Sequence, residues 1–191
     1  MALFEALLSG ELDEAQIGAV VALIQSRGVT VDELVGAARA MRSHVMPVPF
    51  EPGPGEVVID TCGTGGATKT FNISTASALV VAGVQAGSGG PRVIVAKHGN
   101  RSVSSMGGSA DVLEACGVKL DVTAQTSRRA LDDAGVCFLF APRYHSGVRH
   151  AMPVRRALGT RTMFNLLGPL ANPAAPPVQL MGVYDPDLCA P

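Results

Sequence analysis

The chain has 191 residues, of which 47% are hydrophobic and 16% are charged, and its formal net charge is −1. This length suits one large domain or a small domain beside a larger one. A charge near zero argues against nucleic-acid binding, which needs a basic surface. No apolar run is long enough to span a membrane, and the amino-terminal residues are acidic rather than basic. We expect a cytoplasmic protein that binds neither nucleic acid nor membrane.

Residues 1–46 are predicted to form short amphipathic helices. Apolar residues at helical spacing within 17–24 form a stripe that ends at Gly28. Thr30 followed by Glu33 predicts a capping box at the start of another helix. Short helices of this kind cannot bury their apolar faces alone, so we expect them to pack on each other and on a further surface. A second copy of the chain would provide one, which predicts a homodimer through residues 1–46.

The proline- and glycine-rich residues 47–56 predict a linker, and the pattern changes after it. Strands are predicted at 57–60, 93–96 and 136–140, and helices at 76–86, 110–117 and near 124–134. Strands that alternate with helices predict an α/β domain with a mostly parallel sheet over 57–191. In such sheets, ligands bind beyond the carboxyl ends of the strands.

Residues 60–75 follow the first strand and predict a phosphate-binding loop. The glycines let the backbone approach an anion, the hydroxyl side chains add donors, and Ser74 or Thr75 is expected to cap the next helix. The glycines are Gly63, Gly65 and Gly66, and the hydroxyl residues are Thr64, Thr68, Thr70, Ser74 and Thr75. Residues 63–70 also approach the P-loop pattern of nucleotide hydrolases. That pattern requires glycine where Thr68 stands, which leaves a hydrolase as a minor alternative.

Residues 95–117 form a second loop of this kind after the second strand. Lys97, His98 and Arg101 supply charge and donors, and Ser109 is expected to cap the following helix. Two anion-binding loops after two strands suit a ligand with two separated phosphate groups.

Three segments within these regions resemble the anthranilate phosphoribosyltransferase family. They are GTGG…FNIST in 63–75, KHGNRSVSS in 97–105 and VRRALGTRTMFNLLGPLANP in 154–173, in the family's order. The resemblance implies a small helical domain followed by an α/β domain of the nucleoside phosphorylase/phosphoribosyltransferase type. It also implies transfer of a phosphoribosyl group from phosphoribosyl pyrophosphate (PRPP) to anthranilate, with Mg²⁺, in tryptophan biosynthesis.

The same resemblance implies roles for individual residues. PRPP would be held by Gly63, Thr64, Gly65, Gly66, Thr70, Asn72, Ser74, Thr75, Lys97 and Ser109. Anthranilate would contact Gly63, His98, Asn100, His145, Arg155 and Pro169, with Arg155 pairing to its carboxylate. Ser74 would also be a ligand of Mg²⁺. No strong general base is expected, because an aromatic amine is already a free nucleophile at neutral pH.

The sequence departs from the family pattern in three places. Ala67 and Thr68 stand where the family carries Asp-Gly, and Ser146-Gly147 follows His145 where the family prefers proline, which predicts a looser turn. The family's magnesium-binding Asp-Glu pair would lie beyond Pro191. We therefore expect a truncated chain that keeps weak phosphate binding and turns over poorly. A pyrimidine nucleoside phosphorylase-like enzyme and a non-catalytic relative of the fold stay open as alternatives.

Overall fold

A computed structural model describes residues 1–65, 71–84, 91–101 and 107–189. Three helices come first: α1 (Ala2–Ser9), α2 (Glu14–Arg27) and α3 (Val31–Ser43). The capping box predicted at Thr30 is confirmed, because the hydroxyl accepts from Glu33 N while the Glu33 carboxylate accepts from Thr30 N. Asp13 and Gln16 form a second box before α2. Each box supplies partners for N–H groups that the first helical turn leaves unpaired.

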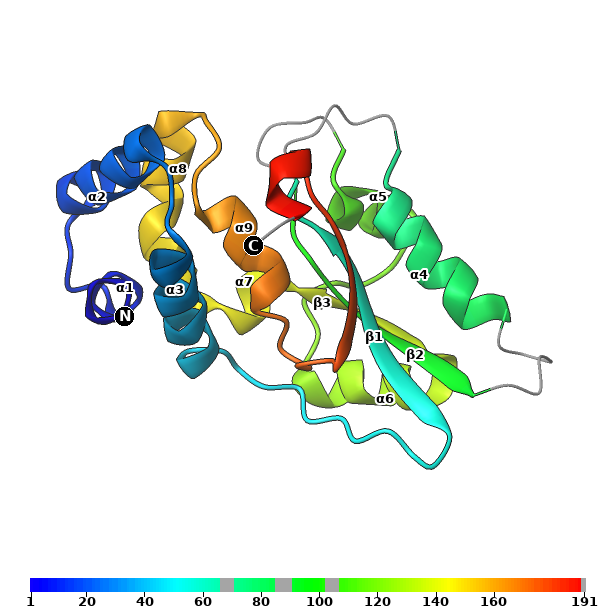
Figure 1. The fold of residues 1–191 in the computed structure, drawn as a ribbon. Coiled ribbons are helices and arrows are strands. Elements are labelled where there is room, and N and C mark those ends of the chain that lie inside the picture. Colours follow the sequence, from blue (N-terminus) through cyan, green and yellow to red (C-terminus); the bar gives the residue numbers. More distant parts are fainter. Residues whose placement is uncertain (66–70, 85–90, 102–106, 190–191) are drawn as a thin grey trace.

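The helices share one hydrophobic core with segments that come much later in the chain (Figure 1). These segments are η1 (Ser146–Ala151), α8 (Met152–Leu158) and α9 (Phe164–Leu170). Ile17, Val21 and Ile24 of α2 are buried there together with Phe164 and Leu167 of α9. The stripe of α2 is therefore covered within the chain, and the homodimer through residues 1–46 stays a prediction.

The α/β part is built on four parallel strands in the order β3-β2-β1-β4. They are β1 (Glu56–Gly63), β2 (Arg92–Gly99), β3 (Val136–Phe140) and β4 (Val178–Gly182). The predicted mostly parallel α/β fold is confirmed, and β4 is an addition to the predicted strands. Because parallel strands end at the same edge, the loops after β1 and β2 leave the sheet side by side.

Helices cover both faces of this sheet (Figure 1). On one face, Leu131 of α6 (Ala124–Ala134) packs with Val58 and Ile94. Thr61, three residues after Val58, points to the other face and donates its hydroxyl to Ser74 O at the start of α4 (Ile73–Val84). The remaining helices of the described ranges are α5 (Ser109–Ala115), α7 (Ala141–Tyr144) and η2 (Pro186–Cys189). Within those ranges, no helix has the length and apolarity to cross a bilayer.

The stretch between α3 and β1 runs without helix or strand through residues 45–55. It is tied to the α/β part, since Met46 N donates to Tyr144 O and Val48 N donates to Pro173 O. The division of the chain at residues 47–56 stays a prediction, because the helical core described above draws on residues from both sides of it.

Gly147 lies where η1 meets α1. A Cβ at this position would be 2.7 Å from the Leu8 carbonyl oxygen. The structure corrects the expectation of a loose turn, because glycine here lets η1 approach the α1 backbone closely. We expect Gly147→Ala to lower the free energy of unfolding by about 1–3 kcal/mol, measured by urea denaturation. Gly83→Ala, in α4 with open space around it, is the control and should not destabilise. Equal loss in both variants would contradict this account.

Candidate active site

The glycine loop begins where β1 ends. Thr64 is buried; its N–H donates to Gly182 O at 2.9 Å and its hydroxyl accepts from Tyr184 N at 3.2 Å. These bonds fix the start of the loop against the end of β4 and leave the Thr64 O–H free to donate. Gly65 has a φ of 69°, a conformation that glycine adopts without strain. Gly66 and Thr70, and the Ala67-Thr68 departure, lie outside the described residues.

The loop leads into α4. The helix begins at Ile73, so its N-cap position is Asn72 and the predicted cap at Ser74 or Thr75 is wrong. Both lie in the first turn instead, where backbone N–H groups lack helical partners. Thr75 Oγ1 is buried and has no hydrogen-bond partner in the described part of the chain. An unsatisfied hydroxyl at the start of a 12-residue helix favours a polar or anionic ligand there.

Lys97 connects the ends of the two strands that precede these loops. Its side chain is 3% exposed, and Nζ donates to Thr61 O of β1 at 2.6 Å. Burial lowers the pKa of Lys97 from its ordinary value, and the nearby negative charge of Asp60 opposes this shift. An ammonium group has three N–H donors, of which the bond to Thr61 uses one. The structure thus ties the ends of β1 and β2, from which the two loops leave, together through a cation.

The second loop continues beyond β2 with Asn100 and Arg101. Both are exposed, and Asn100 Oδ1 accepts from Arg101 N. Arg101 is paired with Asp111 and Glu114 of α5, so its charge is compensated within the loop. The N-cap of α5 is Gly108 rather than Ser109, which corrects the predicted cap. Ser109 is half-buried at the first helical position.

His98 and His145 form a buried pair of rings. Their centroids lie 5.1 Å apart, and each side chain is 6% exposed. His98 Nδ1 lies 3.0 Å from Gly168 O; a carbonyl only accepts, so this nitrogen carries the proton. The Nε2 atoms of both rings are buried without a partner among the described residues. Two buried ring nitrogens without a partner in the described part of the chain suit a ligand that offers N–H or O–H groups.

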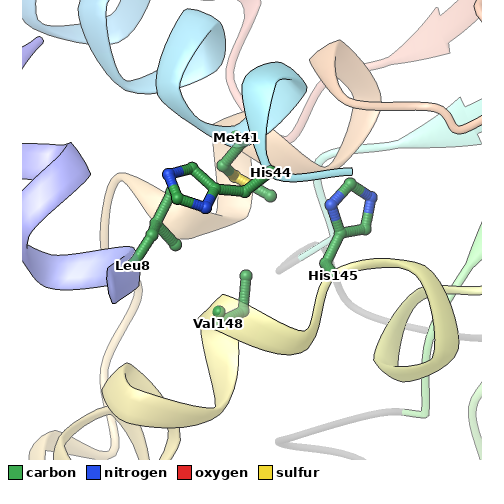
Figure 2. A pocket seen from close by; sticks show the side chains of 6 residues that line it. Leu8, Met41, His44, His145 and Val148 are labelled. Carbon is green, nitrogen blue, oxygen red and sulfur yellow. The ribbon is translucent and has the colours of Figure 1, made fainter. Parts of the chain in front are cut away.

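The two rings are neutral at pH 7. Burial lowers the pKa of His98 to about 4, with the bond to Gly168 O opposing this shift and the nearby Lys97 charge contributing to it. Burial also lowers the pKa of His145 to about 4, with His98 adding to the effect. His145 lies where the helical core meets the α/β part, among Leu8, Met41 and Val148 (Figure 2). The pair therefore marks the junction between the two parts of the chain.

The other predicted anthranilate contacts lie along α9. Pro169 is buried near the carboxyl end of this helix, beside the Gly168 carbonyl that binds His98. Arg155 of α8 lies over the Phe164 ring near the other end, with Cζ 5.2 Å from the ring centroid. Residues 164 and 168 are separated by roughly 6 Å along a helix axis. Burial lowers the pKa of Arg155, and none of the ion pairs among the described residues involves it.

Sequence reasoning missed two polar residues beneath the site. Asp60 is fully buried on β1; its carboxylate accepts from His98 N and from Gln179 Nε2 of β4. Gln179 Nε2 also lies 2.7 Å from Pro169 O. The available signal was a lone carboxylate at the end of the otherwise apolar strand 57–60, since a buried charge needs hydrogen-bond partners.

The described residues do not form a magnesium site by themselves. Mg²⁺ prefers six oxygen ligands, including one or two carboxylates and the phosphates of a substrate. Ser74 offers one hydroxyl, and both oxygens of Asp60 are already hydrogen-bonded. In the described ranges, no group of three or more Asp, Glu, His or Cys side chains is arranged to hold a metal ion.

Two family models cover nearly the whole chain. The model for the helical bundle domain of a glycosyl transferase family matches residues 1–45, and the model for its α/β domain matches residues 55–191. The chain belongs to this glycosyl transferase family. The match supports the helical and α/β parts seen in the structure, and it includes both loops and the His98–His145 pair.

The relatives in this family are anthranilate phosphoribosyltransferases, which confirms the resemblance of the motifs. The enzyme of Sorangium cellulosum is 57% identical over 188 residues, 98% of this chain and 51% of that protein. A relative from Pectobacterium carotovorum is 54% identical over 191 residues and is also covered to 51%. This chain thus spans about half the length of the curated relatives that it matches.

Solved structures of the same enzyme share the fold. The Thermus thermophilus enzyme superimposes with a TM-score of 0.87 at 41% identity, over 100% of this chain and 55% of that one. The Saccharomyces cerevisiae enzyme in complex with PRPP and Mg gives a TM-score of 0.76 at 29% identity, over 92% of this chain and 47% of that one. Another structure of the yeast enzyme holds 4-fluoroanthranilate.

Proposed function

We propose that this chain carries the PRPP-binding loops and the anthranilate site of an anthranilate phosphoribosyltransferase. The observation that carries the proposal is that β1 and β2 are paired in parallel, with Lys97 Nζ bonded to Thr61 O, so that the segments after both strands begin at one edge of the sheet. The glycine loop, the start of α4 and the second loop would then surround one bound PRPP molecule at this edge. PRPP would be held by residues of both loops and of the first turn of α4. These are Gly63, Thr64, Gly65, Gly66, Thr70, Asn72, Ser74, Thr75, Lys97 and Ser109.

Anthranilate would bind beside this edge, where α9 meets β2. Arg155 would pair with the carboxylate, Pro169 and the exposed Asn100 would line the entry, and His98 and His145 would face the amine. Two neutral rings with unpaired Nε2 atoms can accept hydrogen bonds from an amine without competing for its lone pair. This arrangement orients the nitrogen for attack on the ribose carbon.

The proposed reaction breaks the bond from ribose carbon 1 to the pyrophosphate oxygen and forms a bond from that carbon to the amine nitrogen. Pyrophosphate leaves with the bonding electron pair, and the amine nitrogen loses one proton to solvent. The chain contributes by stabilising the leaving group with Lys97 and with N–H and O–H donors at the start of α4, and by positioning the amine. The Mg²⁺ that accompanies PRPP in the yeast enzyme would add charge neutralisation when bound.

The activity of the whole protein belongs to this proposal, because the chain spans about half of its relatives. We expect binding of PRPP and anthranilate by a cytoplasmic protein that binds neither nucleic acid nor membrane. Dimerisation through the first helices remains proposed. Leu23 of α2 and Val31 of α3 are 70% and 68% exposed, and they would form part of that contact.

A competition assay tests the proposed function. The chain, PRPP and Mg²⁺ are mixed with anthranilate, thymidine or uridine, and binding and product formation are followed by calorimetry and chromatography. We expect binding of anthranilate and no binding of either nucleoside. Binding of thymidine or uridine in place of anthranilate would reject the assignment in favour of a nucleoside phosphorylase.

A further inference from the structure

Asp60 is an unusual residue for the position it occupies. It lies on the face of β1 that also carries Val58, yet it is fully buried. A buried carboxylate is unfavourable unless its oxygens accept hydrogen bonds. Its two oxygens accept from different strands, one from His98 N of β2 at 3.2 Å and one from Gln179 Nε2 of β4 at 3.1 Å. Asp60 therefore holds the strands on both sides of β1 at the level of the site.

Gln179 connects Asp60 to the end of α9. Its amide nitrogen carries two N–H donors and lies within hydrogen-bond distance of both Asp60 Oδ2 and Pro169 O. Pro169 O belongs to the last turn of α9, where carbonyl groups have no partner within the helix. The neighbouring Gly168 O accepts from His98 Nδ1. Side chains from β2 and β4 thus fix the same turn, and Asp60 anchors both of those strands.

We infer that Gln179, held by Asp60, is a positioning residue for the anthranilate site: it fixes the Gly168–Pro169 turn and so holds the His98 ring with its proton on Nδ1 and its Nε2 available to accept. The inference rests on the proposed function for the identity of the ligand. Gln179 is assigned this role through the turn and not through a contact with the ligand. Its effect on binding passes through the carbonyl of Gly168, whose position decides which nitrogen of His98 is protonated.

Gln179→Met tests this inference, because methionine has a similar length and no N–H donor. The exposed Gln25 of α2 offers the matched control, Gln25→Met. Anthranilate binding is measured by fluorescence, PRPP binding by calorimetry, and the protonated nitrogen of His98 by ¹⁵N NMR of histidine-labelled chain. We expect Gln179→Met to weaken anthranilate binding about tenfold and to leave PRPP binding unchanged. We also expect it to replace the single Nδ1–H form of His98 by a mixture of tautomers. Gln25→Met should change none of these.

Three outcomes decide the inference. Unchanged anthranilate affinity together with an unchanged His98 spectrum in a folded Gln179→Met chain would overturn it. If that variant does not fold, hydrogen exchange of side-chain amides is measured on the unsubstituted chain instead. Exchange of the Gln179 N–H protons as fast as that of Gln25 would overturn the inference. Exchange at least about tenfold slower would support it. If the unsubstituted chain binds no anthranilate, the proposed function fails, while the His98 tautomer comparison still decides whether Gln179 acts as a positioning residue.

Discussion

An Arg155→Gln variant is expected to bind anthranilate about 100-fold more weakly than the unsubstituted chain. Arg155 stacks on Phe164, and burial lowers its pKa. A guanidinium stays charged even so, and no carboxylate among the described residues forms an ion pair with it. A partly buried cation without an acidic partner gains most from a ligand carboxylate. The measurement is a titration followed by the fluorescence of anthranilate.

The neighbouring Arg156 is exposed and provides the control. Arg156→Gln should bind anthranilate like the unsubstituted chain, and both variants should bind PRPP normally. Arg155→Lys should lose about tenfold, because an ammonium keeps the charge and lacks the planar fork that binds both carboxylate oxygens. Equal affinities in Arg155→Gln and Arg156→Gln would show that the carboxylate of anthranilate is bound elsewhere.

Acidification from pH 7 to pH 5 is expected to lower the free energy of unfolding by roughly 3 kcal/mol through His98 and His145 together. Both have a pKa of about 4 in the folded chain against an ordinary value of 6.5. Between pH 6.5 and 4 the unfolded chain therefore binds more protons than the folded chain. The stability from these groups is fully present above pH 6.5 and is lost as the pH falls toward 4. Urea denaturation at several pH values measures it.

A His145→Gln variant separates this effect from other titrating groups. It removes one of the two rings, so the loss of stability between pH 7 and pH 5 should fall by about half. The range from pH 7 to pH 5 excludes most carboxylate titration, since the ordinary pKa values of carboxyl groups lie below pH 5. A free energy of unfolding that stays constant from pH 7 to pH 5 would contradict the neutral, buried state of the pair.

The core of the fold was predictable because its strands are short apolar runs between glycine-rich segments. Strands were expected at 57–60, 93–96 and 136–140, and β1, β2 and β3 contain them. The structure extends β1 and β2 to Gly63 and Gly99, because parallel pairing with a neighbour continues through polar residues. β4 was missed because it is an edge strand with alternating exposure, and its five residues contain no continuous apolar run.

The site was predictable as two loops but not as a set of contacts. Local pattern placed the caps at Ser74 and Ser109, whereas α4 and α5 begin so that Asn72 and Gly108 occupy the N-cap positions. Asn72 and Ser74 at the start of α4, and Gly108 and Ser109 at the start of α5, all favour N-cap positions, and tertiary packing selects one residue of each pair. The approach of His145 to His98 joins distant segments, and periodicity within one segment contains no information about it.

The central claim is that the loops after β1 and β2 bind one PRPP molecule together. Titration of ¹⁵N-labelled chain with PRPP and Mg²⁺ tests it most directly. The account predicts that the amide signals of Gly63, Gly65, Ser74 and Thr75 shift together with those of Lys97 and Ser109, along one binding curve, while those of α2 stay in place. Shifts confined to one loop, separate curves for the two loops, or no shift in either at millimolar PRPP would contradict it.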